Sequence, residues 1–335
     1  MTIRVGINGF GRIGRLAFRI AEQDPDIEVV AINNPSDLEC AAYLAKYDSC
    51  QGRVFDECRA EEGALIVDGH RIKAFQTRDP QELEWGEVGA DVVIESTGKL
   101  KDGTVAKAHL EKGAKKVVIT APGKNVDATI VMGVNQDVYD KDTMNIVSNA
   151  SCTTNCLAPF AKVLNDTFGI KRGFMNTIHS YTNDQKVLDV HHKDFRRSRA
   201  AALSQIPTTT GAAKAVALVI PEMAGKLDGM ATRVPTPTGS MVALTAELET
   251  PATAEEINAA MKAAAEGPMK GILEYCTDPI VSTDVIGNRA SSIYDSLLTK
   301  VLGGDKGDFV KCISWYDNEM GYSQRVIDLA KFLVA

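Results

Sequence analysis

The sequence predicts a two-domain α/β fold, in which a mostly parallel, doubly wound sheet is followed by an α+β domain with an antiparallel sheet. The chain has 335 residues, which is long for a single hydrophobic core. In its first half, short apolar runs typical of buried strands alternate with helical patterns. In its second half, long strand patterns at Gly239–Thr250 and Phe309–Trp315 flank an alanine-rich helix at Ala254–Glu266. We therefore expect domains at 1–150 and 151–317, with a terminal helix at 318–335 that packs back on the first domain.

The composition is ordinary for a globular enzyme, with 44% hydrophobic and 24% charged residues. The net charge is −7, from 44 acidic and 37 basic residues, so the chain carries no footprint for nucleic acid or for a membrane surface. We find no apolar run long enough to span a bilayer and no signal peptide. Seven cysteines without a secretory signal indicate free thiols and a cytoplasmic location. No metal-ligand spacing occurs, and we expect no metal site.

A glycine-rich turn is the first element with a chemical meaning. Arg4–Asn8 reads as a strand, and glycines 9, 11 and 14 follow it before a helical stripe and a second strand at Ile27–Asn33. This is the G-x-G-x-x-G pattern in its required setting. Gly9 permits the tight turn, Gly11 lets backbone approach a pyrophosphate, and Gly14 allows close helix packing. The pyrophosphate would rest on the helix N-terminus, as in a Rossmann domain that binds a dinucleotide.

Strand ends after this motif are candidate cofactor contacts. Ser96–Gly98 and Thr120–Pro122 fall at such ends, where parallel sheets bind ligands, although ordinary turns would also explain them. The acidic residue that would hold the ribose hydroxyls falls near Asn34, and an amide there does not repel a 2′-phosphate. NADP therefore stays open beside NAD. The strands are expected at the apolar runs Ala64–Val67, Asp91–Thr97, Lys116–Thr120 and Ala128–Val134, with a helix at Thr104–Gly113.

Cys152 lies where a strand pattern gives way to a helical one. Its neighbours, Ser148–Cys156, are rich in the hydroxyl and amide residues that suit a helix start, and the helical pattern stops at Gly169. Unpaired N–H groups and the helix dipole lower the pKa of a thiol at such a position, so we expect a reactive thiolate. A buried structural cysteine is the alternative interpretation.

His179 is the best partner base for this thiol. Gly173–Ile178 reads as a strand that ends at His179, in the same half of the chain as Cys152. His70 and His109 lie in polar segments typical of a surface, and His191 and His192 lie in a basic loop. A single histidine at a strand end is often structural, but with a thiol at a helix start it fits nucleophilic catalysis.

The segment between 180 and 240 is rich in hydroxyls and cations. Thr210 and Gly211 open a helix that runs to Val219, which provides one anion site, and Arg196–Arg197 and Arg233 add positive charge. Two separate anion sites are therefore indicated, with ordinary loops or helix caps as the alternative.

These motifs together resemble the phosphorylating glyceraldehyde-3-phosphate dehydrogenase family. The segments that carry the resemblance span the chain: Gly6–Gly14, Ser148–Asn155, His179–Gln185, Pro207–Lys214, Arg233–Pro237 and Ser314–Tyr322. The resemblance implies a Rossmann domain, a catalytic domain, a C-terminal helix that returns to the cofactor domain, and a homotetramer. It also implies oxidation of glyceraldehyde 3-phosphate with NAD and inorganic phosphate to 1,3-bisphosphoglycerate.

The resemblance also assigns roles to residues. Cys152 would attack the aldehyde to form a thiohemiacetal and then a thioester, and His179 would take the proton and stabilise the oxyanion. Thr182 and Arg233 would hold the phosphate of the substrate. The attacking phosphate would be held by Ser151, Thr153, Arg197, Thr210 and Gly211. The cofactor would be held by Gly9, Gly11, Arg12, Ile13, Asn34, Arg78, Thr97, Thr120 and Asn318.

Two departures from the family pattern concern cofactor choice. NAD-preferring relatives carry Asp at the position of Asn34, and strict NAD users carry Pro at the position of His191, in a loop that approaches the adenosine ribose across a subunit interface. The hypothesis is that NAD use is retained with relaxed discrimination against NADP. Neutral drift at both sites is the alternative.

Other activities compete with this interpretation. Erythrose-4-phosphate dehydrogenase shares the fold, the thiol and the histidine but needs no phosphate, which the cradle at Thr208–Gly211 argues against. Aspartate-semialdehyde dehydrogenase is a more distant thioester-forming relative. A non-catalytic surface role, such as adhesion or plasminogen binding, is a different class, and intact Cys152 and His179 argue against a retired enzyme.

Overall fold

The computed structural model describes residues 2–335 and divides into two compact units. The first unit contains the residues up to Met132, Gln136–Ser151 and Ser323–Ala335, and the second contains Gly133–Asn135 and Cys152–Tyr322. Each unit is built on its own sheet. No helix among the described residues is long and apolar enough to cross a membrane.

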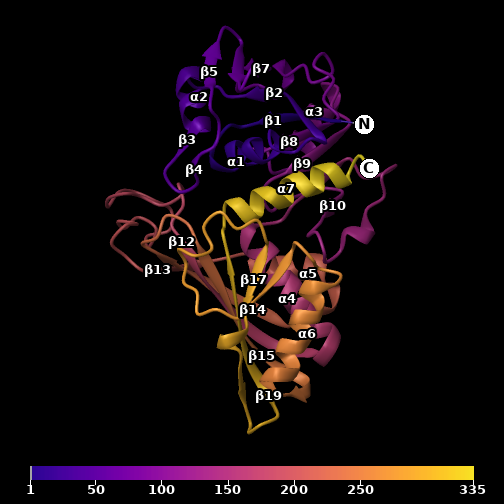
Figure 1. Cartoon of the computed structure of the whole chain (residues 1–335), viewed down its shortest axis with the longest axis vertical. Coiled ribbons are helices and arrows are strands. Elements are labelled where there is room, and N and C mark those ends of the chain that lie inside the picture. The colour runs from indigo at the N-terminus through magenta and orange to yellow at the C-terminus, as the bar shows by residue number, and fades with distance from the viewer. Residues whose placement is uncertain (1) are drawn as a thin grey trace. The chain divides into compact units, whose positions relative to one another are not determined.

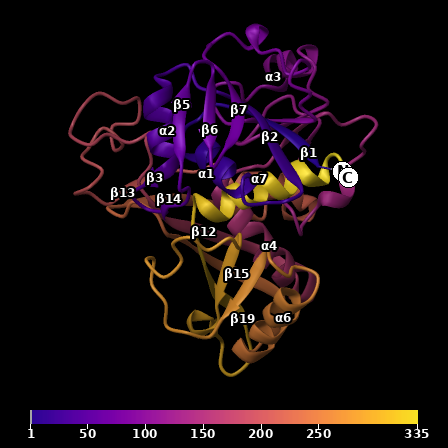
Figure 2. The same cartoon turned by 45° about the horizontal axis from the view of Figure 1, so that its top comes forward.

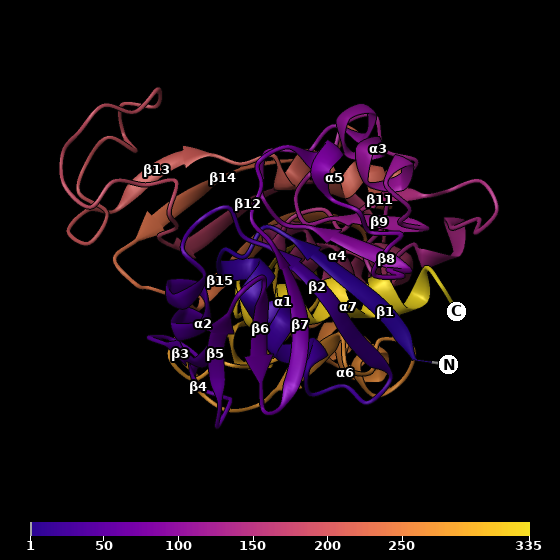
Figure 3. The same cartoon turned by 90° about the horizontal axis from the view of Figure 1, so that it is seen from above.

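A mostly parallel sheet forms the core of the first unit. Its strands run in the order β10-β11-β9-β8-β1-β2-β7-β6-β5, and all neighbours are parallel except at the β7-β6-β5 edge. Figure 3 shows β1, β2 and β7 side by side. The strands are β1 (Ile3–Asn8), β2 (Ile27–Asn33), β5 (Cys58–Glu61), β6 (Ala64–Val67), β7 (His70–Phe75), β8 (Val92–Glu95), β9 (Lys116–Ile119), β10 (Ala128–Thr129) and β11 (Ile146–Ser148).

Helices connect the parallel strands, as doubly wound sheets require. They are α1 (Arg12–Ala21), α2 (Leu38–Lys46), α3 (Gly103–Glu111) and two short 3-10 turns, η1 (Pro80–Glu82) and η2 (Gln136–Val138); β3 (Tyr47–Asp48) and β4 (Gly52–Arg53) form a small ladder. In β8 and β9 every residue is buried, which explains the apolar runs Val92–Ile94 and Val117–Ile119.

The last helix, α7 (Met320–Phe332), belongs to the first unit from Ser323 onward. Its Lys331 forms ion pairs with Asp24 and Asp26, and the Tyr139 hydroxyl donates to the backbone oxygen of Leu333 at 2.8 Å. These contacts tie the end of the chain to the unit that contains β1.

The second unit is an α+β fold on a largely antiparallel sheet of order β13-β14-β12-β15-β19-β17-β16. β12 pairs in parallel only with β14, and β16 only with β17. The strands are β12 (Ile170–Ser180), β13 (Ile206–Thr209), β14 (Leu227–Val234), β15 (Ser240–Ala252), β16 (Leu273–Cys276), β17 (Ser292–Asp295), β18 (Lys300–Leu302), which pairs with β19, and β19 (Gly307–Tyr316). The predicted fold class is therefore confirmed.

Helices of the second unit pack on this sheet: α4 (Cys152–Phe168), α5 (Ala212–Val219), α6 (Ala254–Glu266) and the 3-10 turns η3 (Pro221–Met223) and η4 (Ser296–Leu298). α4 contacts β15 and lies against α5 and α6; Figures 1 and 2 show α4 and α6 together beside the sheet. α6 has its predicted bounds because Thr253 and Glu256 form a capping box at its start.

One predicted strand is much shorter than expected. Of the run Ala128–Val134, only Ala128–Thr129 forms β10. Ile130 and Val131 are fully buried outside any strand, and the chain turns at Gly133, where φ is +82°. The Ile130 N–H still donates to the Ser148 oxygen of β11 at 2.9 Å, and the apolar residues beyond it reflect burial in the core.

Candidate active site

A tight turn presents Cys152 at the start of α4. β11 ends at Ser148, and two residues later Ala150 has φ +55°, in the left-handed region that a residue with a Cβ rarely adopts. Ala150 is buried, and its N–H donates to Ser148 Oγ at 3.1 Å. α4 then begins at Cys152 and ends before Gly169, whose φ of +71° suits a helix C-terminus. The thiol therefore occupies the helix start that the sequence predicts.

His179 faces this thiol, with its Nε2 3.5 Å from Cys152 Sγ. Its Nδ1 lies 2.7 Å from the backbone oxygen of Ser180. Two groups approach Nδ1: the Ser180 oxygen, which can only accept, at 2.7 Å, and Arg233 Nη1, which can only donate, at 3.1 Å. The shorter contact assigns the proton of the neutral ring to Nδ1, so Nε2 presents a lone pair to the thiol. This is the arrangement that a general base needs to take the thiol proton.

Burial governs the charge of this pair. It raises the pKa of Cys152, although the charge of Arg233 and hydrogen bonds involving Thr153 act in the opposite direction. Burial, followed by the charge of Arg233, lowers the pKa of His179 to about 3. Burial therefore opposes the thiolate that the helix start favours, and the thiolate expected from the sequence stays a prediction. A neutral thiol would pass its proton to Nε2 as it attacks.

Arg233 lies beside the pair because β12 and β14 run in parallel with His179 opposite Arg233. Its Nη1 donates to the Ser180 oxygen at 3.0 Å and to Thr182 Oγ1 at 3.3 Å. Its Nε is buried and has no hydrogen-bond partner among residues 2–335. Thr182 and Arg233, predicted to act together, are therefore brought together.

A second cationic group lies at Arg197. Its Nε donates to Thr208 Oγ1 at 2.9 Å, and its Nη1 forms an ion pair with Asp184. Thr210 Oγ1 accepts from the N–H of Ala212 at 3.2 Å at the start of α5, where Gly211 provides no side-chain cap. The sequence analysis grouped Arg197 with the cradle at Thr208–Gly211, and the structure brings Arg197 and Thr208 together. It missed Asp184 as a partner, because the separation along the chain gave no signal for this ion pair.

Tyr316 is the other residue that sequence reasoning missed. Its ring packs edge-on against the His179 ring, with centroids 6.0 Å apart. Its hydroxyl bonds to Thr153 Oγ1 at 3.0 Å and to Thr177 Oγ1 at 2.9 Å. Tyr316 therefore ties the first turn of α4 to the strand that carries His179, and a hydroxyl at the end of a predicted strand was the only available signal.

Asn318 is held firmly in the same unit. Its Oδ1 accepts from the N–H of Gly239 at 3.2 Å and from Ser240 Oγ at 2.9 Å. With its oxygen engaged, Nδ2 is the group of this side chain that can donate to a ligand.

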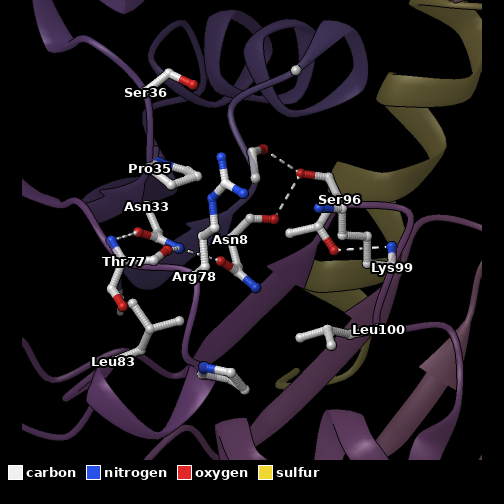
Figure 4. A pocket seen from close by; sticks show the side chains of 14 residues that line it. Asn8, Asn33, Pro35, Ser36, Thr77, Arg78, Leu83, Ser96, Lys99 and Leu100 are labelled. Atoms are coloured by element: carbon white, nitrogen blue, oxygen red, sulfur yellow. Dashed lines mark hydrogen bonds between the residues drawn. The ribbon is translucent and has the colours of Figure 1, made fainter.

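The first unit contains a pocket of about 340 Å³ at the carboxyl ends of β1, β2 and β8. Figure 4 shows Asn8, Asn33, Arg78 and Ser96 around it, and Gly9, Gly11 and Thr97 also line it. A Cβ on Gly14 would lie 2.0 Å from the Gly9 oxygen, so α1 approaches the turn as closely as the glycine pattern predicts. α1 begins without a side-chain cap, which leaves its first N–H groups available to a pyrophosphate. The pocket therefore fits a dinucleotide.

The remaining predicted cofactor residues do not line this pocket. Arg12 forms an ion pair with Asp48, and Ile13 is half-buried on α1. Asn34 Nδ2 donates to the backbone oxygens of Ser36 and Asp37 at 3.3 and 3.4 Å. Thr120 lies at the end of β9, where its Oγ1 donates to the Glu95 oxygen at 3.1 Å.

The interpretation of His109 as a surface residue is wrong. Its side chain is fully buried, and it bonds to Glu95 and Trp85. The polar residues near His109 in α3 suggested a surface position. The partners that show its burial are distant in the sequence, so the local pattern could not reveal them.

A dinucleotide pocket in one unit and a thiol–imidazole pair with adjacent cations in the other are features of a dehydrogenase that works through a cysteine nucleophile. Family models agree with this class. The model described as "Glyceraldehyde 3-phosphate dehydrogenase, NAD binding domain" matches residues 3–103, and "Glyceraldehyde 3-phosphate dehydrogenase, C-terminal domain" matches residues 151–318.

Similar proteins cover the whole chain. The glyceraldehyde-3-phosphate dehydrogenase of Geobacillus stearothermophilus is 59% identical over 335 residues, which is 100% of this chain and 99% of that protein. Glyceraldehyde-3-phosphate dehydrogenase 1 of Bacillus subtilis (strain 168) is 57% identical, covering 99% and 98%, and that of Streptomyces coelicolor is 56% identical, covering 99% of each. The chain belongs to the glyceraldehyde-3-phosphate dehydrogenase family. It is an NAD-dependent oxidoreductase, and the alternative functions are not favoured.

Proposed function

We propose that this chain oxidises D-glyceraldehyde 3-phosphate with NAD and inorganic phosphate to 1,3-bisphosphoglycerate through a thioester on Cys152. The observation that carries the proposal is the 3.5 Å contact between Cys152 Sγ and His179 Nε2, with the lone pair of Nε2 facing the thiol. In this proposal the first unit is the cofactor domain and the second is the catalytic domain.

His179 takes the thiol proton as Sγ attacks the aldehyde carbon, and the resulting imidazolium stabilises the thiohemiacetal oxyanion. When bound, NAD supplies the acceptor for the hydride that leaves this carbon. The imidazolium gives its proton to the oxyanion, and His179 takes it back from the resulting hydroxyl as the hydride leaves, so that the thioester forms on Cys152. The thioester keeps the energy that hydrolysis would release, and phosphate oxygen displaces the Cys152 sulfur to give the acyl phosphate.

Two cationic groups support a route that needs two phosphates. Arg233 and Thr182, whose Nη1 and Oγ1 lie 3.3 Å apart, hold the phosphate of the substrate. Arg197 receives the attacking phosphate together with Ser151, Thr153, Thr210 and Gly211. Inorganic phosphate competes there with Asp184, which already neutralises Arg197.

The cofactor is held by the glycine turn, Arg78 and Thr97, and Asn318 Nδ2 donates to the nicotinamide amide. The predicted cofactor residues that do not line the pocket contact the cofactor at the edge of the pocket; they are Arg12, Ile13, Thr120 and Asn34. A second, weaker use of NADP is supported because Arg78 and Lys99 line the described pocket and no carboxylate does. Exposed His191 adds a group that a 2′-phosphate could meet in an assembled enzyme.

The NADP proposal is tested with Asn34→Asp. A carboxylate repels the 2′-phosphate, so we expect kcat/KM with NADP to fall at least about tenfold relative to NAD. An unchanged ratio, or no turnover of NADP by the wild type, would refute relaxed discrimination.

We also propose that the enzyme is a cytoplasmic homotetramer. All seven cysteines are free thiols. Large apolar side chains are exposed on the segment 187–203, and Phe174, Met230 and Phe309 are exposed on the sheet of the same unit. A second copy of the chain is the partner that would cover them.

Intact-mass spectrometry tests the central step. Wild-type protein given glyceraldehyde 3-phosphate and NAD without phosphate should accumulate an acyl adduct on Cys152, and added phosphate should discharge it. Iodoacetamide should label Cys152 in the free enzyme and not in the acylated enzyme. No adduct on Cys152, or an adduct indifferent to phosphate, would overturn the proposal.

A further inference from the structure

A buried carboxylate lies beneath the dinucleotide pocket of the first unit. Glu95 is the last residue of β8 and is 2% exposed. Four donors surround it: Asn8 Nδ2 at 2.6 Å and His109 Nε2 at 3.0 Å on Oε2, and the N–H of Thr97 at 2.9 Å with the Thr97 hydroxyl on Oε1. No lysine or arginine forms an ion pair with it among residues 2–335. Hydrogen bonds alone therefore compensate its desolvation.

Trp85 fixes which group donates and which accepts in the hydrogen bond between His109 and Glu95. Trp85 Nε1 can only donate, and it lies 3.0 Å from His109 Nδ1. Nδ1 is therefore the acceptor of the ring, and Nε2 carries the proton that is donated to Glu95. His109 and Trp85 are fully buried, so this chain of bonds is dry and its members have little freedom to turn.

The same network shapes the pocket wall. Asn8 Oδ1 accepts from Asn33 Nδ2 at 2.7 Å, and Asn33 Oδ1 accepts from the N–H of Thr77 at 3.1 Å. Asn8, Asn33, Thr77 and Thr97 all line the pocket. Figure 4 shows the bond between Asn33 and Thr77 at its edge. Through these hydrogen bonds, the Glu95 carboxylate thus fixes the positions of the residues at the carboxyl ends of β1, β2 and β8.

The glycine turn is placed by the same groups. A Cβ on Gly9 would lie 2.6 Å from the Thr97 nitrogen, so the turn rests directly on the backbone that Glu95 holds. Ser96 Oγ donates to the backbone oxygens of Asn8 and Gly9 at 3.0 and 2.6 Å, as Figure 4 shows. A shift of Thr97 would therefore move the turn that approaches the pyrophosphate.

We propose that Glu95 and His109 are positioning residues for the cofactor, which set its affinity by holding Thr97, Asn8 and the Gly9 turn. Neither reacts with substrate. The inference rests on the proposed function, in that the pocket is taken to bind NAD.

The test is titration of full-length protein with NAD by calorimetry, together with steady-state kinetics. In Glu95→Gln the amide nitrogen must face one of the donor pairs, so the network cannot be satisfied in either orientation. We expect the Kd for NAD to rise at least about tenfold, with kcat at saturating NAD within about threefold of wild type. Trp85→Phe removes a single N–H and should raise Kd about threefold in a folded protein.

Glu22→Gln is the matched control. Glu22 forms the other carboxylate–histidine pair of this unit, with the partly exposed His70 at 3.2 Å, and it does not line the cofactor pocket. Its loss should leave the Kd unchanged. An unchanged Kd in folded Glu95→Gln, or a fall in kcat without a change in Kd, would overturn the inference. If Glu95→Gln does not fold, an unchanged Kd in Trp85→Phe would overturn it. A wild type that does not bind NAD would instead refute the proposed function and this inference with it.

Discussion

At the scale of single residues, catalysis depends on the lone pair that His179 presents to Cys152. His179→Asn removes the base and leaves a polar group that can still bond to the Ser180 oxygen. We expect kcat/KM to fall by about 10²–10⁴-fold, because general base catalysis contributes that much. Steady-state rates at pH 7 measure it. His70→Asn, at the partly exposed histidine of the first unit, serves as the control, and equal rates for the two variants would contradict the assignment.

The same histidine should make folding sensitive to acid. Its pKa is about 3 in the folded chain and about 6.5 when unfolded, so between these values the unfolded state binds more protons. Stability is therefore lost as pH falls from 6.5, by up to about 1.4 kcal/mol per pH unit. Urea unfolding of wild type and His179→Asn from pH 7 to pH 4 should show a shallower decline in the variant. Parallel curves would show that His179 titrates normally.

At the scale of elements, the β1–α1 turn depends on the absence of a Cβ at Gly14 but not at Gly11. A Cβ on Gly14 would lie 2.0 Å from the Gly9 oxygen, whereas one on Gly11 meets nothing within 4 Å and φ there is −79°. Gly14→Ala should therefore lower the free energy of unfolding by about 2 kcal/mol or more, and Gly11→Ala by less than about 0.5 kcal/mol. Denaturant unfolding without cofactor measures both, and equal losses would contradict the turn geometry.

Elements with local causes were predictable from the sequence. The end of α4 before Gly169 and both ends of α6 follow from glycine and capping residues, which act within a few positions. The roles of His109 and Tyr316 were not predictable, because their partners lie 14 to 163 residues away. The burial that raises the pKa of Cys152 was not predictable either, since the local pattern reports the helix end but not the residues packed around it. The strand predicted at Ala128–Val134 was too long for a similar reason, because a run of apolar residues indicates burial but does not say whether the buried chain forms a strand.

At the scale of the whole molecule, the exposed apolar segment 187–203 predicts an assembly. Leu188 is 70% exposed, and a carboxylate there would oppose burial against a second copy. Leu188→Asp should therefore shift the mass measured by light scattering from a tetramer to smaller species. Val105→Asp, at an exposed valine on α3, should leave the mass unchanged. A tetrameric Leu188→Asp protein, or a monomeric wild type, would refute this interface.

The central claim is that Cys152 carries a thioester which phosphate resolves. The most direct measurement is the initial rate of NADH formation at 340 nm with glyceraldehyde 3-phosphate and NAD, with and without inorganic phosphate, in wild type and Cys152→Ser. We expect sustained turnover only in the wild type with phosphate, and a single burst of NADH without it. A wild-type rate independent of phosphate, or turnover by Cys152→Ser, would contradict the account.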